Sequence, residues 1–133
     1  MGKPAAGTSV EDQAKRYGVH NMRRHLLLCA GPECVSPERG EAAWAYLKKR
    51  LAELQLDQAP THLYRTKVHC LRMCTAGPIA VVQPEGVWYH SADPPVIERI
   101  LQEHILGGRV VKEYAFAEVP LDGGIAVNVR CGK

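Results

Sequence analysis

The chain has 133 residues, of which 46% are hydrophobic and 23% are charged, and its formal net charge is +3. This length fits one domain, and this composition is typical of a globular protein rather than of a disordered or fibrous one. No apolar run approaches the roughly 20 residues of a membrane-spanning helix, and so mild a positive charge does not indicate nucleic-acid binding. The five cysteines are the most informative feature of the composition.

Residues 1–22 are rich in Gly, Lys, Arg and small residues and are expected to form a flexible N-terminal arm. Twin arginines at Arg23 and Arg24 then precede three leucines and Cys29, an arrangement that superficially resembles an export signal. A true signal needs about 7–15 apolar residues before its cleavage site, so we do not expect export. The protein is expected in the cytoplasm, where thiols stay reduced and cysteine pairs bind metals or act in catalysis more often than they form disulfides.

The next elements alternate between strand and helix. Residues 24–29 form a short apolar run typical of a buried strand, and a helix is expected to begin at Ser36 and Pro37 and to end before Pro60. Apolar residues recur along this helix at intervals of three and four, namely Trp44, Leu47, Leu51 and Leu54. Residues 62–68, which are rich in Thr, Tyr and Val, predict a second strand.

A hairpin and a second helix are expected to follow. Residues 79–83 and 87–90 flank a Pro-Glu-Gly turn, and a helix begins after Asp93 and stops at two glycines, so the domain is expected to span residues 23–108. The order strand, helix, strand, strand, strand, helix predicts a two-layer α/β fold. Residues 109–133 are expected to form a C-terminal extension, either an added β-hairpin or a segment that binds a partner.

Four of the five cysteines form two pairs. Cys29 and Cys34 follow the first strand as Cys-x4-Cys, and Cys70 and Cys74 follow the second strand as Cys-x3-Cys. If these two strands are parallel neighbours, both loops lie at the same end of the sheet and the four thiolates can converge. Cys131 has no partner at similar spacing and is interpreted as a free thiol near the chain end.

Four thiolates suit either zinc or an iron–sulfur cluster, because soft sulfur ligands select both. Structural zinc sites favour tight Cys-x2-Cys pairs, although longer spacers occur, whereas the two irons of a [2Fe–2S] cluster are held by two cysteines each and suit longer intervals. Gly31 and Gly77 have no side chain and leave room for backbone N–H groups near the sulfurs. The spacing favours iron–sulfur and leaves zinc and redox thiols open.

At these cysteines the chain resembles the thioredoxin-like [2Fe–2S] ferredoxins, of which the Shethna-type and Aquifex-type proteins are examples. The resemblance covers roughly residues 25–106 and continues toward residue 116. It is carried by three stretches of sequence, HLLLCAGPEC, RTKVHCLRMCTAGPIAVVQPEGVWY and IERILQEHILGGRVVKEYAF. The cysteine pattern, the Ala-Gly-Pro that follows it and the Pro-Glu-Gly-Val-Trp-Tyr strand match together, which is more specific than any one of them.

The resemblance implies a thioredoxin-like fold with a β-α-β-β-β-α core and a mixed sheet. It implies a one-electron carrier without substrate turnover, commonly a homodimer, that works with redox partner proteins and not with nucleic acid or membranes. It assigns Cys29, Cys34, Cys70 and Cys74 as the ligands of a single [2Fe–2S] cluster. Two features depart from the pattern: the first cysteine pair is close-set, and the chain is slightly basic, whereas many ferredoxins are acidic.

Two alternatives belong to other classes. One is a zinc-stabilised thioredoxin-fold binding module without redox activity, and the other is a thiol enzyme, against which the missing Cys-x-x-Cys motif counts. Arg72, between the last two ligands, is either a cation that favours the reduced cluster or a solvated loop charge. We interpret Trp44 as a core residue and His104 as a surface residue, and Trp88 and Tyr89 are expected to face opposite sides of their strand.

Overall fold

The sheet is the centre of the molecule. A computed structural model of the chain describes residues 8–121, in which five strands form one mixed sheet of order β2-β1-β3-β4-β5. The strands are β1 (Arg24–Cys29), β2 (Leu63–Val68), β3 (Ile79–Gln83), β4 (Val87–Tyr89) and β5 (Ala115–Glu118). The helices are α1 (Val10–Tyr17), α2 (Pro37–Leu54) and α3 (Pro94–Arg99), which a π-helical segment (Ile100–Leu106) continues, and a 3-10 turn (Val19–Asn21) follows α1.

Strands β1 and β2 are parallel, and every other neighbouring pair is antiparallel. In the parallel register Cys29 lies opposite Val68, so both strands finish at the same end of the sheet. This is the arrangement that the strand–helix–strand opening predicts, and the mixed α/β sheet is confirmed. It brings the loop after β1 and the loop after β2 to one end of the molecule.

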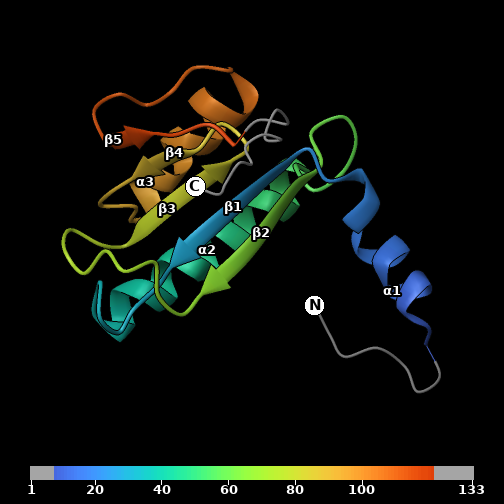
Figure 1. The fold of residues 1–133 in the computed structure, drawn as a ribbon, viewed down its shortest axis with the longest axis horizontal. Helices are drawn as coiled ribbons and strands as arrows, with labels where there is room; N and C mark the ends of the chain where they lie inside the picture. Colours follow the sequence, from blue (N-terminus) through green and yellow to red (C-terminus); the bar gives the residue numbers. More distant parts are fainter. Residues whose placement is uncertain (1–7, 122–133) are drawn as a thin grey trace, which may run out of the picture.

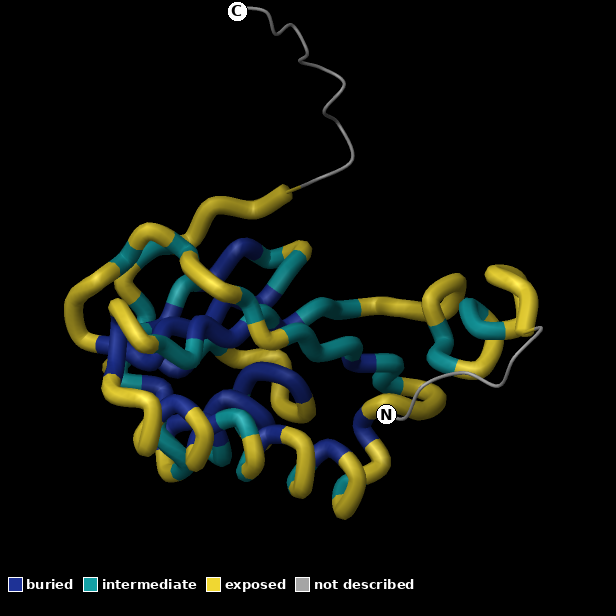
Figure 2. The backbone as a smooth tube through the Cα atoms, turned by 90° about the horizontal axis from the view of Figure 1, so that it is seen from below, coloured by how far each residue is buried: buried dark blue, intermediate teal, exposed yellow. Residues whose placement is uncertain are grey.

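Helices α2 and α3 cover one face of the sheet: in Figure 1 they lie behind the strands, and in Figure 2 the sheet and the helices form two layers whose buried stretches are dark blue. Helix α2 begins where Ser36 accepts a hydrogen bond from the N–H of Arg39 at 3.3 Å, with Pro37 in its first turn. Its apolar stripe buries Leu47 and Leu51 against the sheet. Full burial of a side chain of this size stabilises the fold by about 1.5–3 kcal/mol.

The N-terminal region holds a helix that the sequence reading does not predict. Within the arm expected at residues 1–22, residues 10–17 form α1, which lies beyond one end of the sheet (Figure 1). Ser9 caps α1 by accepting a hydrogen bond from the N–H of Asp12 at 3.0 Å, and Gly18 ends it. Because α1 buries none of its residues, local capping and not an apolar stripe defines it, and hydrophobic periodicity gives no signal there.

Within the extension expected at residues 109–133, β5 pairs with β4, with Ala117 opposite Trp88. The rest of that extension, residues 122–133, lies outside the described residues. One expectation about a side chain needs correction. His104 is not a surface residue: it is 2% exposed, and its Nδ1 forms a 2.8 Å hydrogen bond with the hydroxyl of Tyr89. Burial lowers the pKa of His104, so the ring is held neutral within the core.

Candidate metal centre

The first cysteine pair lies in a shielded pocket at the end of β1. The Sγ atoms of Cys29 and Cys34 are 2.9 Å apart, and both side chains are buried. The thiol of Cys34 also donates to the carbonyl of Cys29 at 3.2 Å. Burial, together with the hydrogen bond and the charge of Cys29, raises the pKa of Cys34 to about 11, so this thiol is protonated at neutral pH.

Apolar side chains surround this pair. Val35 and Ile79 are buried against Cys29 and Cys34, and four partly buried residues pack around them: Val68, Leu71, Met73 and Trp88. Trp88 faces this cluster while Tyr89 is fully buried on the helix-covered side, which confirms the expected alternation along the strand. The pocket is therefore dry on most sides, as a thiolate site that excludes water requires.

The second cysteine pair lies on the neighbouring loop but points away from the first. Cys70 and Cys74 are exposed, whereas Leu71 and Met73, which alternate with them, turn inward onto the cluster. The second loop does approach the first cysteine pair: the carbonyl of His69 lies 4.0 Å from the Sγ of Cys29. The topology thus brings the four cysteines to one end of the sheet, and the side chains of two of them face solvent.

Across residues 8–121, no three His, Cys, Asp or Glu side chains lie close enough together to hold one metal ion. The N–H of Arg72 donates to the Sγ of Cys70 at 3.2 Å, and Arg72 has a left-handed backbone with φ of 68°. The loop that carries Cys70 and Cys74 therefore donates a backbone hydrogen bond to one of its own two cysteine sulfurs. The assignment of all four cysteines as ligands stays a prediction, and Cys131 lies outside the described residues.

Two glycines allow the backbone to close tightly around the first pair. A Cβ at Gly77 would overlap the carbonyl of Cys34, and a Cβ at Gly40 would overlap the carbonyl of Ala30. Gly77 is one of the two glycines that the sequence singles out, whereas Gly40 is missed. The signal for Gly40 is its place inside a strongly predicted helix, where glycine costs about 1 kcal/mol relative to alanine and so indicates a close contact.

Comparison with known proteins identifies the family. No family model matches the chain. The chain is 34% identical over 110 residues to a protein of Priestia megaterium named as a candidate 2Fe-2S ferredoxin, and the match covers 83% of both chains. It is also 29% identical over 99 residues to a 2Fe-2S ferredoxin of Clostridium pasteurianum, which covers 69% of this chain and 94% of that one. The chain belongs to the 2Fe-2S ferredoxin family.

The fold agrees with this family. The thioredoxin-like [2Fe-2S] ferredoxin of Aquifex aeolicus superposes with a TM-score of 0.61 at 21% sequence identity, over 73% of this chain and 99% of that chain. A cysteine-to-serine variant of the same protein superposes with a TM-score of 0.63 at 22% identity, over 72% and 100% of the two chains. These likenesses confirm the predicted thioredoxin-like fold.

In this member of the family, an ion pair between Arg39 and Asp93 links three segments next to the cysteines, and the sequence does not predict it. The guanidinium of Arg39 donates to both carboxylate oxygens of Asp93, at 3.1 and 2.6 Å, and to the carbonyl of Gly77 at 3.1 Å. It thereby joins the start of α2, the start of α3 and the loop that leads into β3. Arginine and aspartate at helix starts are too common for their spacing to reveal this contact.

Proposed function

We propose that the chain is a one-electron carrier that binds a single [2Fe–2S] cluster through Cys29, Cys34, Cys70 and Cys74 and turns over no substrate of its own. The supporting observation is the parallel pairing of β1 and β2, which places both cysteine loops at one end of the sheet. Four thiols, a dry apolar surround and a glycine seated against Cys34 suit a cluster with cysteine ligands.

Binding requires side chains in both loops to move. Two thiolates on one tetrahedral metal with bonds of 2.3 Å stand about 3.8 Å apart, so Cys29 and Cys34, at 2.9 Å, must separate. The side chains of Cys70 and Cys74 must turn toward the first pair, and those of Leu71 and Met73 must leave the apolar cluster to make room for them. The two cysteine segments are already close, because the carbonyl of His69 lies 4.0 Å from the Sγ of Cys29.

When bound, an oxidised [2Fe–2S] centre with four thiolates carries a charge of −2, and it accepts one electron. The role of the chain is to set the energy of that added charge. Arg72 lies between Cys70 and Cys74, and its cation favours the more negative state. Val35 and Ile79 exclude water from the buried side, while the exposed loop of Cys70 and Cys74 leaves a short path to a partner protein.

The same proposal covers assembly and location. Leu27, the buried Val81 and Trp88 are register partners on β1, β3 and β4. Their neighbours along each strand pack in the main core with α2 and α3, so these three lie on the opposite face of the sheet. Phe116, 42% exposed, packs edge-on against Trp88 on this face. We assign this apolar face to the contact between two copies in a homodimer, and sedimentation of the purified protein measures whether the dimer forms.

Within residues 8–121 no helix has the length and apolar content to cross a membrane. We further propose that the carrier works in the cytoplasm, where free thiols stay reduced, with redox proteins as its partners.

Cysteine variants test the ligand assignment. In anaerobically purified protein, Cys70→Ser is expected to lose or strongly destabilise the visible chromophore, because serine supplies no soft thiolate. Cys131→Ser, the matched control, is expected to keep the wild-type spectrum and iron content. If Cys131→Ser bleached the protein while Cys74→Ser did not, the ligand set would be wrong. Colourless wild-type protein with one zinc per chain would replace the electron carrier by a zinc-stabilised binding module.

A further inference from the structure

Three cations surround the indole ring of Trp44 at one edge of the sheet. The guanidinium of Arg65 lies 5.4 Å from the ring centroid, and the ammonium groups of Lys48 and Lys67 each lie 6.0 Å from it. Lys48 and Trp44 come from α2, and the other two come from β2, which is an edge strand (Figure 1). We call these four residues the Trp44 face.

The Trp44 face has few counter-charges among the described residues. Glu41 pairs with Lys67 at 3.3 Å, but its side chain is 70% exposed and the pair is screened by solvent. The Nε of Arg65 is inaccessible to solvent and has no hydrogen-bond partner among the described residues. Trp44 is partly buried and packs against the core, and three cations also gather around its ring, an arrangement that favours an approaching anion.

A groove lies between Lys67 of the Trp44 face and the cysteine end of the sheet. Its volume is about 480 Å³, and it runs between the loop after β1, the start of α2 and the end of β2. Lys67 and its partner Glu41 line the groove together with Gly31 and His69, which are neighbours of the cysteine loops. Lys67 immediately precedes Val68, which packs against the buried cysteine pair. A segment that pairs with Lys67 and enters this groove therefore lies close to the proposed metal centre.

We propose that the Trp44 face and this groove dock an acidic surface segment of the redox partner protein. This inference rests on the proposed electron-carrier function and adds to it the chemical class of the partner. Carboxylates of the partner would pair with Lys48, Lys67 and Arg65 and would bring its redox centre beside the cysteine loops. Charge pairs of this kind accelerate and orient an encounter more than they tighten it, as an electron carrier that must release its partner requires.

A nucleic acid is the less favoured occupant. Three cations on one short edge form a compact patch rather than a track along a phosphate backbone, and the chain carries a net charge of only +3. The face also lies beside the cysteine loops, where a redox partner must approach and a nucleic acid need not.

The test uses cluster-loaded full-length protein and a fluorescently labelled octaglutamate peptide as the acidic probe. Anisotropy is expected to show salt-sensitive binding that weakens about fivefold or more in the Lys48→Gln/Lys67→Gln double variant, which removes two charge pairs. The matched control, Lys49→Gln/Lys112→Gln, removes the same charge elsewhere and is expected to bind as the wild type does. Bound peptide is also expected to slow oxidation of the dithionite-reduced protein by ferricyanide, because it covers the approach to the cysteine loops.

Three results would overturn the inference. These are equal loss of octaglutamate binding in the control variant, unchanged binding in the Lys48→Gln/Lys67→Gln variant, and tighter binding of octathymidylate than of octaglutamate. Iron and visible absorbance are measured on the same samples. If they match the wild-type cluster while binding is unaffected, the docking surface fails and the electron carrier stands. If iron and colour are absent from all samples, the proposed function fails, and the redox identity of the partner fails with it.

Discussion

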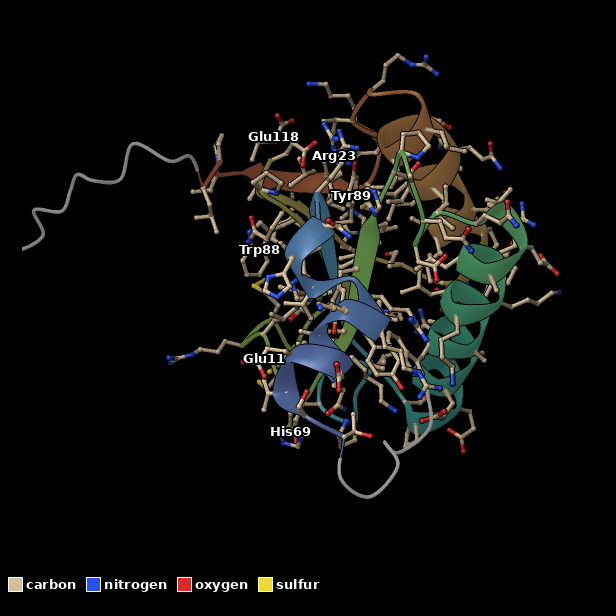
Figure 3. All side chains as sticks on the ribbon, turned by 90° about the vertical axis from the view of Figure 1, so that its right-hand side faces the viewer. Glu11, Arg23, His69, Trp88, Tyr89 and Glu118 are labelled. Atoms are coloured by element: carbon tan, nitrogen blue, oxygen red, sulfur yellow. The ribbon has the colours of Figure 1, made fainter. Side chains whose placement is uncertain are left out.

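At the end of the sheet where β1 begins, polar side chains are joined by hydrogen bonds and an ion pair. At the end where β1 finishes, two of the four cysteine side chains are exposed to solvent. The hydroxyl of Tyr89 bonds His104 at 2.8 Å and accepts the N–H of Val111 at 3.1 Å. Glu85 pairs with Arg24 at 2.6 Å and lies 3.7 Å from the His104 ring. Figure 3 shows Arg23 and Tyr89 toward one end and His69 at the other.

One end of the sheet therefore contributes mainly to the stability of the fold, and the other end carries the proposed metal centre. The hydroxyl of Tyr89 and the two groups that bond it, His104 Nδ1 and the N–H of Val111, have their hydrogen bonds inside the protein and so contribute to the free energy of unfolding. Cys70 and Cys74 make almost no packing contacts of their own, and the loop that carries them has left-handed backbone at Arg72 and Ala76. Substitutions at one end are therefore expected to change the free energy of unfolding, and those at the other to change iron content.

The largest expected change in unfolding free energy comes from Tyr89→Phe. Removing the hydroxyl leaves the N–H of Val111 and Nδ1 of His104 buried without partners, at a cost of about 2–4 kcal/mol. Denaturant titration measures the loss, and iron content is expected to stay at the wild-type value. Tyr114→Phe is the matched control, with an expected effect within about 0.5 kcal/mol. A comparable loss in both variants would show that the network is not special.

Gly77→Ala is expected to have the next largest effect and to act at the cysteine end. The new Cβ would overlap the carbonyl of Cys34, which costs about 1–3 kcal/mol and pushes the first cysteine pair out of place. Iron content is expected to fall together with stability. At Gly108 a Cβ would meet no atom within 4 Å, so Gly108→Ala is expected to cost only about 1 kcal/mol, from its left-handed backbone, and to keep its iron. Equal iron loss in both variants would contradict the contrast.

The smallest expected effect lies between the two ends, where Glu98 joins α3 to α2. Arg50 and Tyr46 each donate to Glu98 at 2.8 Å, and the bond with Arg50 is the main cause that lowers the pKa of Glu98 to about 2. Because this pKa is depressed in the folded state, the stabilisation is present above about pH 4.3 and is lost as the pH falls toward 2.

Glu98→Gln is expected to cost about 1 kcal/mol at pH 7 and to flatten the pH dependence of the unfolding free energy between about pH 4.3 and 2. Iron content is expected to be unchanged at pH 7. Glu11→Gln, on the exposed helix α1, is the control and is expected to follow the wild-type profile. An unchanged acid profile in Glu98→Gln would show that this carboxylate is not coupled to folding.

Much of the fold could be predicted because local signals and burial agree. The apolar run of β1, the Ser36 cap of α2 and the turn at Pro84 each point to the element that forms. Helix α1 could not be predicted from apolar periodicity, because it buries nothing and depends on its caps. The burial of His104 depends on Tyr89, 15 positions away, a distance over which a helical pattern carries no information.

The candidate site shows a similar division. Spacing alone predicts that the two cysteine pairs meet at one end of the sheet, because parallel pairing of β1 and β2 follows from the helix between them. Which side chains of the Cys70–Cys74 loop turn inward could not be predicted, since Leu71 and Met73 compete with the cysteines for the same apolar surface. The surroundings of Trp44 could be predicted only in part, because two of the three cations around its ring come from a strand remote in sequence.

The central claim is that this end of the sheet holds one [2Fe–2S] cluster. Its most direct test is the iron and acid-labile sulfide content of anaerobically purified wild-type protein, read together with its visible absorbance. The account predicts about two irons and two sulfides per chain, with absorbance that dithionite bleaches. A colourless protein that carries one zinc per chain and no sulfide would contradict it.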